Sequence, residues 1–195
     1  MKRIGYGQVE PNHLSGSHTG QIYAQLPATG INQLENGQFL KYDYANKRAG
    51  VGTSGDGKEW FLVFNEEKLY DERYQNHRYA VELSKNYTDG TIYPRLIRTY
   101  VGDIFTTNTF KGTTPATASD GDTEVTMEDL TIGDYLTVGA DGWLTKTAGT
   151  GTGGTGMPDA DMVWQVVPHF TQIENPGTAY TLPDGQPAVK IQRVK

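Results

Sequence analysis

The sequence contains no cysteine, so the fold has no disulfide framework and the protein has no thiolate nucleophile or thiolate metal ligand. Basic side chains are also scarce: 17 lysines and arginines stand against 23 aspartates and glutamates, which gives a net charge of −6. A surplus of negative charge repels the phosphates of nucleic acids and anionic lipid headgroups alike. We therefore expect neither nucleic acid nor membrane as a main partner.

Long apolar runs are missing as well. Hydrophobic residues make up 36% of the chain, and no stretch approaches the ~20 consecutive apolar residues of a membrane-spanning helix. Residues 1–8 lack the apolar core of a secretory signal peptide. We therefore expect synthesis in a cytoplasm, with no export route visible. The 24 glycines indicate a chain with many turns.

What the sequence does contain is a series of short apolar segments separated by turn residues. Residues 130–147 are typical of a β-hairpin, because apolar side chains recur at strand spacing on both sides of Asp141-Gly142. Asp-Gly favours a type I′ turn, in which both central residues have positive φ. The frame Leu-x-x-Gly-[Gln/Asp]-[Phe/Tyr]-Leu occurs there and again at residues 34–42. The repetition indicates either an internal duplication of a β unit or a chance match.

Turn signals recur along the whole chain. Asn36-Gly37, five Asp-Gly pairs and the apolar run at residues 60–64 predict an all-β fold, a small antiparallel β-barrel or sandwich. Residues 65–76 alone show helical spacing, which allows one or two short helices at most. We expect a β-rich body over residues 29–195, in which residues 65–124 form either an insertion or a second subdomain.

Residues 1–28 precede this body and are rich in glycine but poor in apolar side chains. Segments of this composition often stay extended until a partner orders them. We therefore predict an extended N-terminal arm, with a frayed terminus as the alternative. The large side chains of the arm would contact the partner: Tyr6, Leu14, Ile22, Tyr23 and Leu26.

Aromatic residues are the clearest remaining signal in the body. The chain has 12 tyrosines, and tyrosine is enriched at protein interfaces because it combines broad apolar area with a polar tip. Tyr44 and Tyr87 stand in polar surroundings and are our interface candidates. We place the three tryptophans in the core: Trp60, Trp143 and Trp164.

Residue clusters that could carry chemistry are weak. His13 and His18 are close in sequence, but only Glu10 could join them, so we predict two solvated histidines and no metal site. Neighbouring carboxylates in polar company are usually solvated rather than catalytic. They occur at Glu66/Glu67, at Glu124/Glu128/Asp129 and at Asp159/Asp161. We therefore predict no enzyme activity and no cofactor.

The segment Gly133 to Lys146, read together with Asn36 to Lys41 and the glycine-rich amino segment, resembles the capsid decoration (cement) proteins of tailed phages. The resemblance implies a small β-barrel-like body on the outside of a capsid. It also implies an arm laid across neighbouring subunits of the major capsid protein, and often a trimer at a local threefold axis. No catalytic residues are implied, because such proteins act through surfaces.

Our leading hypothesis is therefore a non-catalytic virion structural protein, made in the host cytoplasm, that binds the outer surface of an assembled bacteriophage capsid and stabilises it. The partners would be the major capsid protein lattice and further copies of the chain, as a homo-oligomer such as a trimer. A ligand that binds only the assembled lattice stabilises it by mass action. Two alternatives stay open: a carbohydrate-binding module or head-fibre component that binds glycans through exposed aromatics, and a glycan hydrolase.

Overall fold

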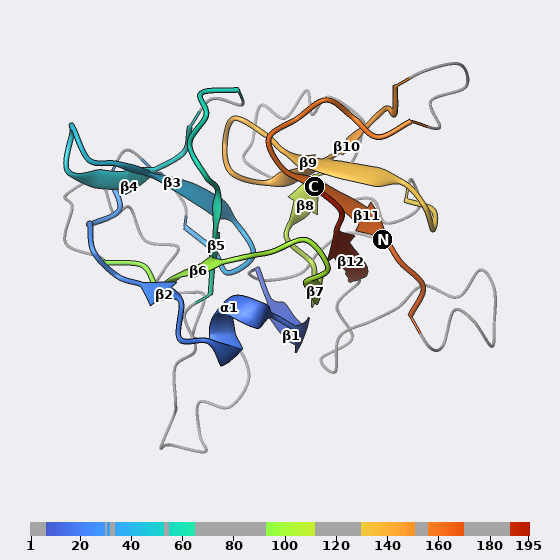
Figure 1. Ribbon diagram of the computed structural model, residues 1–195, viewed down its shortest axis with the longest axis horizontal. Helices are drawn as coiled ribbons and strands as arrows, with labels where there is room; N and C mark the ends of the chain where they lie inside the picture. Colours follow the sequence, from blue (N-terminus) through green and yellow to red (C-terminus); the bar gives the residue numbers. More distant parts are fainter. Residues whose placement is uncertain are drawn as a thin grey trace, which may run out of the picture.

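The computed structural model describes residues 7–29, 31, 34–52, 55–64, 93–111, 130–150, 156–169 and 188–195. This part of the chain is built almost entirely from β-strands, which form two sheets, with one short helix, α1 (Ser15–His18). Figure 1 shows the sheet of β2 to β6 on the left and the strands from β7 to β12 on the right. The prediction of an all-β sandwich is confirmed, and the described strands do not close into a barrel.

The first sheet has five strands in the order β2-β6-β5-β3-β4. They are β2 (Ile22–Tyr23), β3 (Phe39–Asp43), β4 (Arg48–Gly50), β5 (Phe61–Val63) and β6 (Leu96–Arg98). The second sheet has seven strands in the order β1-β7-β12-β11-β9-β10-β8. They are β1 (Val9–His13), β7 (Ile104–Thr107), β8 (Phe110–Lys111), β9 (Tyr135–Val138), β10 (Leu144–Thr147), β11 (Val163–Val166) and β12 (Val189–Arg193). Neighbouring strands are antiparallel except for β8 and β10.

The hairpin expected at residues 130–147 is present as β9 and β10, but its turn differs from the expected type I′ turn. Of the two central residues, only Gly142 has positive φ, at 81°. The loop closes instead through the N–H of Gly139, which donates to the carbonyl of Trp143 at 2.8 Å. The carboxylate of Asp141 accepts the Trp143 N–H at 3.2 Å. The wider loop thus uses left-handed backbone at Gly142 and not at Asp141.

The two sheets contain the same five-stranded unit twice. The order β2-β6-β5-β3-β4, the first unit, is repeated as β7-β12-β11-β9-β10, the second unit. The parallel pairing of β8 with β10 also has a counterpart in the first unit, an isolated parallel bridge between Ala28 and Ala49. Cross-strand partners match position by position: Phe39–Leu62 with Tyr135–Gln165, Leu62–Ile97 with Gln165–Gln192, and Phe61–Arg98 with Trp164–Arg193.

The frame shared by residues 34–42 and 130–138 occupies the same place in both units. In each, a glycine with positive φ lies in the turn before a strand: Gly37 at 92° and Gly133 at 97°. The glycine N–H donates to the carbonyl of Val63 in the first unit and of Val166 in the second, at 2.9 Å in both. The structure therefore supports an internal duplication over a chance match.

The two units are stacked, and this stacking places the core. Alternate side chains of a strand point to opposite faces. We call the front face of a unit the one that carries Leu40 in the first unit and Leu136 in the second, and the other its back face. The front face of the second unit packs against the back face of the first in a shared core. The front face of the first unit forms a separate apolar cluster, which includes Leu40, Tyr42, Val63 and Leu96.

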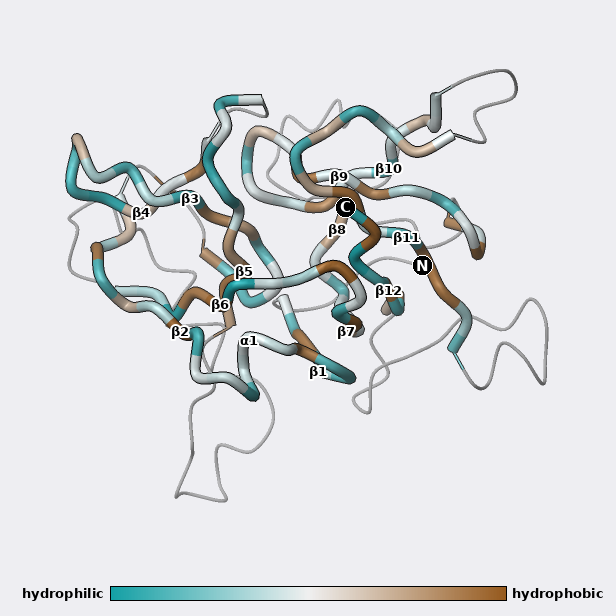
Figure 2. Tube along the Cα trace, in the orientation of Figure 1, coloured by the Kyte–Doolittle hydropathy of each residue, from teal (hydrophilic) through white to brown (hydrophobic). Residues whose placement is uncertain are grey.

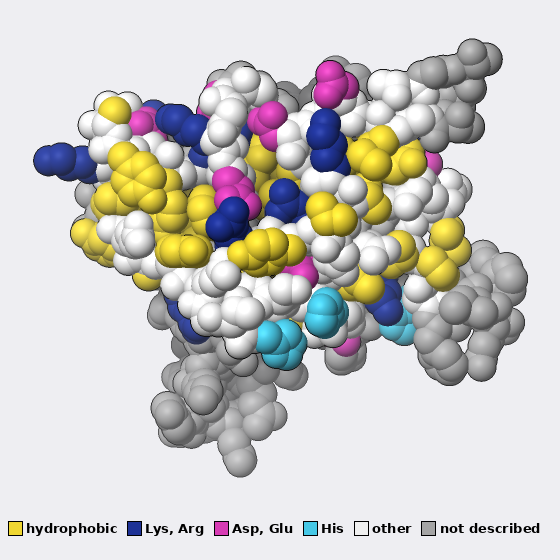
Figure 3. Space-filling view, viewed as in Figure 1, with side chains coloured by type: hydrophobic (Ala, Val, Ile, Leu, Met, Phe, Trp, Pro, Cys, Tyr) yellow, Lys and Arg dark blue, Asp and Glu magenta, His cyan; other side chains and the backbone are white. Residues whose placement is uncertain are grey.

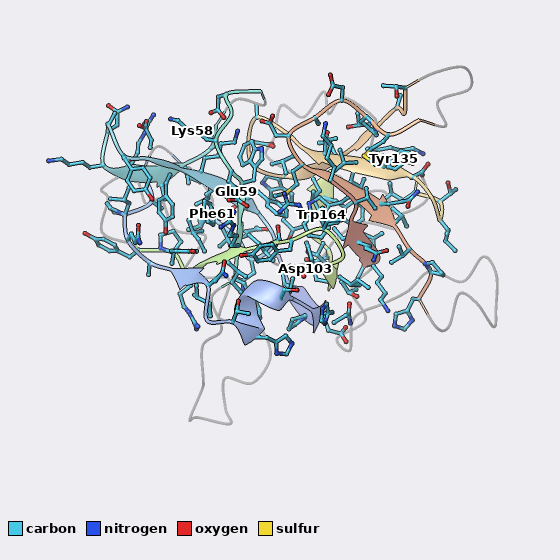
Figure 4. The ribbon with its side chains drawn as sticks, viewed as in Figure 1. Lys58, Glu59, Phe61, Asp103, Tyr135 and Trp164 are labelled. Atoms are coloured by element: carbon cyan, nitrogen blue, oxygen red, sulfur yellow. The ribbon has the colours of Figure 1, made fainter. Side chains whose placement is uncertain are left out.

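Aromatic rings join the two units in the shared core. Trp164 and Phe105, from the front face of the second unit, meet edge to face with ring centroids 4.9 Å apart. Phe39, from the back face of the first unit, lies 5.7 Å from Trp164. Figure 4 shows Trp164 near the middle of the molecule and Tyr135 towards its outer side, and Figure 2 shows hydrophobic segments on strands of both sheets. The predicted core position of all three tryptophans is confirmed, since Trp60, Trp143 and Trp164 are 2%, 6% and 0% exposed.

The described part of the predicted arm, residues 7–28, belongs to both sheets, which differs from the expected separate arm. β1 pairs with β7, β2 pairs with β6, and Leu14 is buried in the shared core. Two glycines of this segment, Gly7 and Gly16, allow close approach. A Cβ at Gly16 would lie 2.1 Å from the carbonyl oxygen of Arg98, and one at Gly7 would lie 2.4 Å from that of Asn36. High glycine content therefore reflects tight packing here and not a loose arm.

A buried carboxylate fixes this segment to the body. Asp103, fully buried, accepts hydrogen bonds from the backbone N–H and the hydroxyl of Ser15, at 3.0 and 2.6 Å. It also accepts the N–H of Tyr100 at 2.9 Å. These bonds tie the start of α1 to the turn between β6 and β7, where Figure 4 labels Asp103.

Candidate binding surface

The residues predicted to contact a partner lie in different environments. Tyr6 and Tyr87 lie outside the described residues. Leu14 is 1% exposed and is therefore a core residue. Ile22 is partly buried against the shared core, and Tyr23 and Leu26 are partly buried against the cluster on the front face of the first unit. Tyr44, the candidate in the body, is 66% exposed.

Four aromatic rings form a continuous row on the first unit, which we call the tyrosine row: Tyr23, Phe61, Tyr42 and Tyr44. Tyr23 meets Phe61 edge to face at 5.5 Å, Phe61 lies 5.2 Å from Tyr42, and Tyr42 stacks on Tyr44 at 5.7 Å. The row thus joins Tyr23, predicted as an arm contact, to Tyr44, predicted as a body contact. Figure 3 shows hydrophobic side chains gathered over this sheet, beside charged side chains in the centre of the face.

Exposure rises sharply at one end of the row. Tyr42 is 5% exposed and Tyr44 is 66% exposed, so Tyr42 supports one side of Tyr44 and leaves most of that ring to solvent. Gln25 contacts both hydroxyls: its N–H donates to Tyr42 at 3.5 Å, and its side-chain oxygen accepts from Tyr44 at 3.4 Å. Burial raises the pKa of Tyr42, against a smaller lowering by Gln25. Burial thus favours the uncharged form of this hydroxyl.

The turn between β3 and β4 holds Tyr44 in place. The carboxylate of Asp43 accepts the side-chain N–H of Asn46 at 2.7 Å and its backbone N–H at 3.3 Å. Arg48 lies 3.5 Å from the same carboxylate. The hydrogen bonds from Asn46 lower the pKa of Asp43. A turn ordered in this way reduces the entropy that Tyr44 would lose on binding.

A second feature is an open cleft of about 760 Å³ between the two sheets. The carboxylates that line it take part in ion pairs. Glu59 lies 3.1 Å from Arg98, Asp159 lies 3.3 Å from Lys195, and Asp161 lies 3.5 Å from Lys41. Asp159 and Asp161, one of the carboxylate groups considered for hydrolysis, therefore serve as ion-pair partners. The other groups lie outside the described residues: Glu66, Glu67, Glu124, Glu128 and Asp129.

Lys41 joins loops of the two sheets beneath this cleft. Its side chain is 2% exposed, and its Nζ lies 2.5 Å from Asp56, in the loop between β4 and β5. Asp161, in the loop before β11, also accepts the N–H of Gly55 at 2.7 Å. The ring centroid of Trp60 lies 4.3 Å from Nζ. Lys41 is thus neutralised and held within the fold, and the hydrogen bond from Lys41 lowers the pKa of Asp56.

The remaining candidates and comparisons add no further site. The rings of His13 and His18 lie 5.9 Å apart, and the described residues hold no group of three or more potential metal ligands. In the same part of the chain, no helix has the length and hydrophobicity needed to cross a membrane. Comparisons of the chain with protein-family models, curated proteins and solved structures give no match.

Proposed function

We propose that the protein is a non-catalytic virion structural protein that binds the outer surface of an assembled phage capsid and stabilises it. The tyrosine row carries the proposal. Tyr44 is an exposed ring that stacks on Tyr42, which in turn packs against Phe61, and it lies in an ordered turn. Rigid aromatic anchors of this kind commonly dominate the binding energy of protein interfaces.

Two further properties support the proposal. The segment that resembles decoration proteins forms the β9–β10 hairpin, whose residues Leu136, Val138 and Leu144 lie in the shared core. The resemblance therefore concerns the scaffold, and the contacts with a capsid would come from other positions. The net charge of −6 suits a protein on the outside of the shell, away from the packaged genome. Assembly as a homo-oligomer, such as a trimer, would add avidity on a repeating lattice.

The decisive experiment uses expanded capsids of the phage that encodes this chain, prepared without the protein. We expect saturable binding and a higher melting temperature of the capsid when the protein is added. Tyr44→Ala should weaken binding at least about tenfold, which corresponds to about 1.4 kcal/mol. Tyr93→Ala is the matched control, because Tyr93 is a 55% exposed tyrosine outside the row.

Capsids that neither bind the protein nor gain stability from it would rule out the proposed function. Binding that is lost equally in Tyr44→Ala and Tyr93→Ala would show that the tyrosine row is not the contact. Binding to a glycan array that disappears in Tyr44→Ala would favour the carbohydrate-binding alternative.

A further inference from the structure

The internal duplication provides a reference for what the tyrosine row binds. Cross-strand pairing makes Tyr23 the equivalent of Phe105, because Tyr23 lies opposite Leu96 and Phe105 opposite Ile191. Phe61 and Tyr42 likewise correspond to Trp164 and Val138. The three residues of the second unit are at most 6% exposed, because the back face of the first unit covers them. In the first unit Tyr42 is equally buried, at 5% exposed, but Tyr23 and Phe61 are only half-buried and Tyr44 is 66% exposed. The tyrosine row is thus the same part of the front face, with three of its four rings open to solvent.

The loop next to this face shows the same contrast. In the second unit, the carbonyl of Gly142 in the β9–β10 loop accepts the N–H of Phe39 in the first unit at 2.7 Å. A Cβ at Gly142 would lie 2.4 Å from the Phe39 carbonyl oxygen, so this contact requires glycine. The equivalent β3–β4 loop carries Tyr44, which is 66% exposed. One copy of the loop therefore lies on a neighbouring β-sheet, and the other presents a tyrosine to solvent.

We infer that the tyrosine row is the docking site for a β-sheet of a partner protein that presents apolar side chains at alternate positions of its strands. The model for that partner surface is the back face of the first unit, with Phe39, Leu62 and Ile97. The inference rests on the proposed function and specifies its contact: an apolar sheet face on the capsid protein. Tyrosine suits an interface that is exposed before assembly, since its hydroxyl stays hydrated while its ring supplies apolar area.

A second copy of this chain does not offer the required surface. Where the first unit has Phe39, Leu62 and Ile97 on its back face, the second unit has Tyr135, Gln165 and Gln192. Docking this polar face on the tyrosine row would remove water from the two amide groups, although Nε2 of Gln165 keeps its hydrogen bond to the carbonyl of Gly133 at 3.1 Å. Head-to-tail stacking of copies would also produce an open fibre rather than a closed assembly. The two glutamines thus prevent self-stacking and leave the row for a different protein.

Docking of an apolar sheet face on the tyrosine row can be tested with the purified protein alone. The double variant Gln165→Leu/Gln192→Ile gives the second unit the side chains that the first unit carries at the same positions. We expect this variant to self-associate in a concentration-dependent way, with an association constant at least about tenfold above that of the wild type by light scattering. Adding Tyr44→Asp should restore the wild-type mass, whereas adding Tyr93→Asp should leave the association unchanged.

Two results would overturn the inference: a folded double variant with the wild-type mass, or self-association that persists with Tyr44→Asp. Circular dichroism verifies folding, and Gln192→Ile alone gives the same test with a smaller effect where the double variant does not fold. Because the assay contains no capsid, its failure is distinct from failure of the proposed function. Self-association without capsid binding would leave the docking chemistry standing and remove the capsid as the partner.

Discussion

The two units share one topology, but the first unit lies between two apolar clusters and the second unit forms an outer layer. β5 of the first unit is apolar at each of its positions, Phe61-Leu62-Val63, because the shared core lies on its back face and a second apolar cluster on its front face. β12 of the second unit alternates, since Val189 and Ile191 point into the shared core while Lys190 and Gln192 do not. A continuous apolar run therefore marks a strand between two apolar layers, and alternation marks an outer layer.

The comparison assumes that the amino segment is part of both sheets, and deletion of residues 1–28 tests this. The deletion removes β1 from β7, β2 from β6 and Leu14 from the shared core. We expect loss of folding, or a drop in melting temperature of more than about 10 °C by circular dichroism, because one buried leucine alone is worth about 2 to 5 kcal/mol. Full-length Leu14→Ala serves as the reference for the side chain. An unchanged melting temperature would show that the segment is a separate arm after all.

Alanine variants at neighbouring positions of β3 and of β9 measure this difference between the two units. Phe39 and Leu40 point to opposite faces of β3, and both are fully buried. Changing either to Ala should lower the free energy of unfolding, by about 3 to 5 kcal/mol for Phe39 and about 2 to 5 kcal/mol for Leu40. In β9, Leu136→Ala should cost as much as Leu40→Ala. Thr137→Ala should cost only about 0.5 to 1.5 kcal/mol, for its 2.6 Å hydrogen bond to Thr147.

Urea unfolding of the four single variants measures these differences. Equal losses for Leu136→Ala and Thr137→Ala would mean that β9, like β3, lies between two apolar layers. The proposed difference between the units would then be wrong.

The smallest expected effect concerns the loops that Lys41 joins. The pKa of Asp56 in the folded protein lies below its ordinary value of 3.8, chiefly because Lys41 hydrogen-bonds to it. A lowered pKa contributes stability above the ordinary value, and that stability is lost as the pH falls through the folded pKa. We expect the melting temperature to fall below about pH 4 and to fall less steeply in Asp56→Asn. Parallel pH curves for the two proteins would exclude a contribution from this ion pair.

The strand pattern predicted much of the fold. The expectation of a separate arm, which came from the glycine content, differs from the structure. The all-β class and the hairpin at residues 130–147 follow from alternation and turn residues. The arm prediction treated glycine as a sign of disorder, whereas Gly16 is needed for close backbone contact with Arg98. Sequence composition alone does not separate these two uses of glycine.

A second short repeat in the sequence links the amino segment to the start of the second unit. Gly20-Gln21-Ile22-Tyr23 matches Gly102-Asp103-Ile104-Phe105, and both glycines have positive φ, at 70° and 99°. Each tetrapeptide leads into the strand that opens its unit, β2 or β7. The tyrosine row, by contrast, draws its members from β2, β5, β3 and the turn after β3. No local pattern predicts that these segments meet, so the row became visible only in the folded chain.

The position of β7 constrains how the polypeptide reaches its native state during translation. Its two neighbours in the sheet are β1, at residues 9–13, and β12, at residues 189–193. Closing that sheet requires contacts across most of the chain length, which slows folding because the loop entropy is lost before the contacts form. Until the ribosome has released residue 193, β7 has one unpaired edge, which is a hazard for misassembly. We therefore expect this sheet to close only after residue 193 has emerged from the ribosome, and to benefit until then from chaperones that shield the edge of β7.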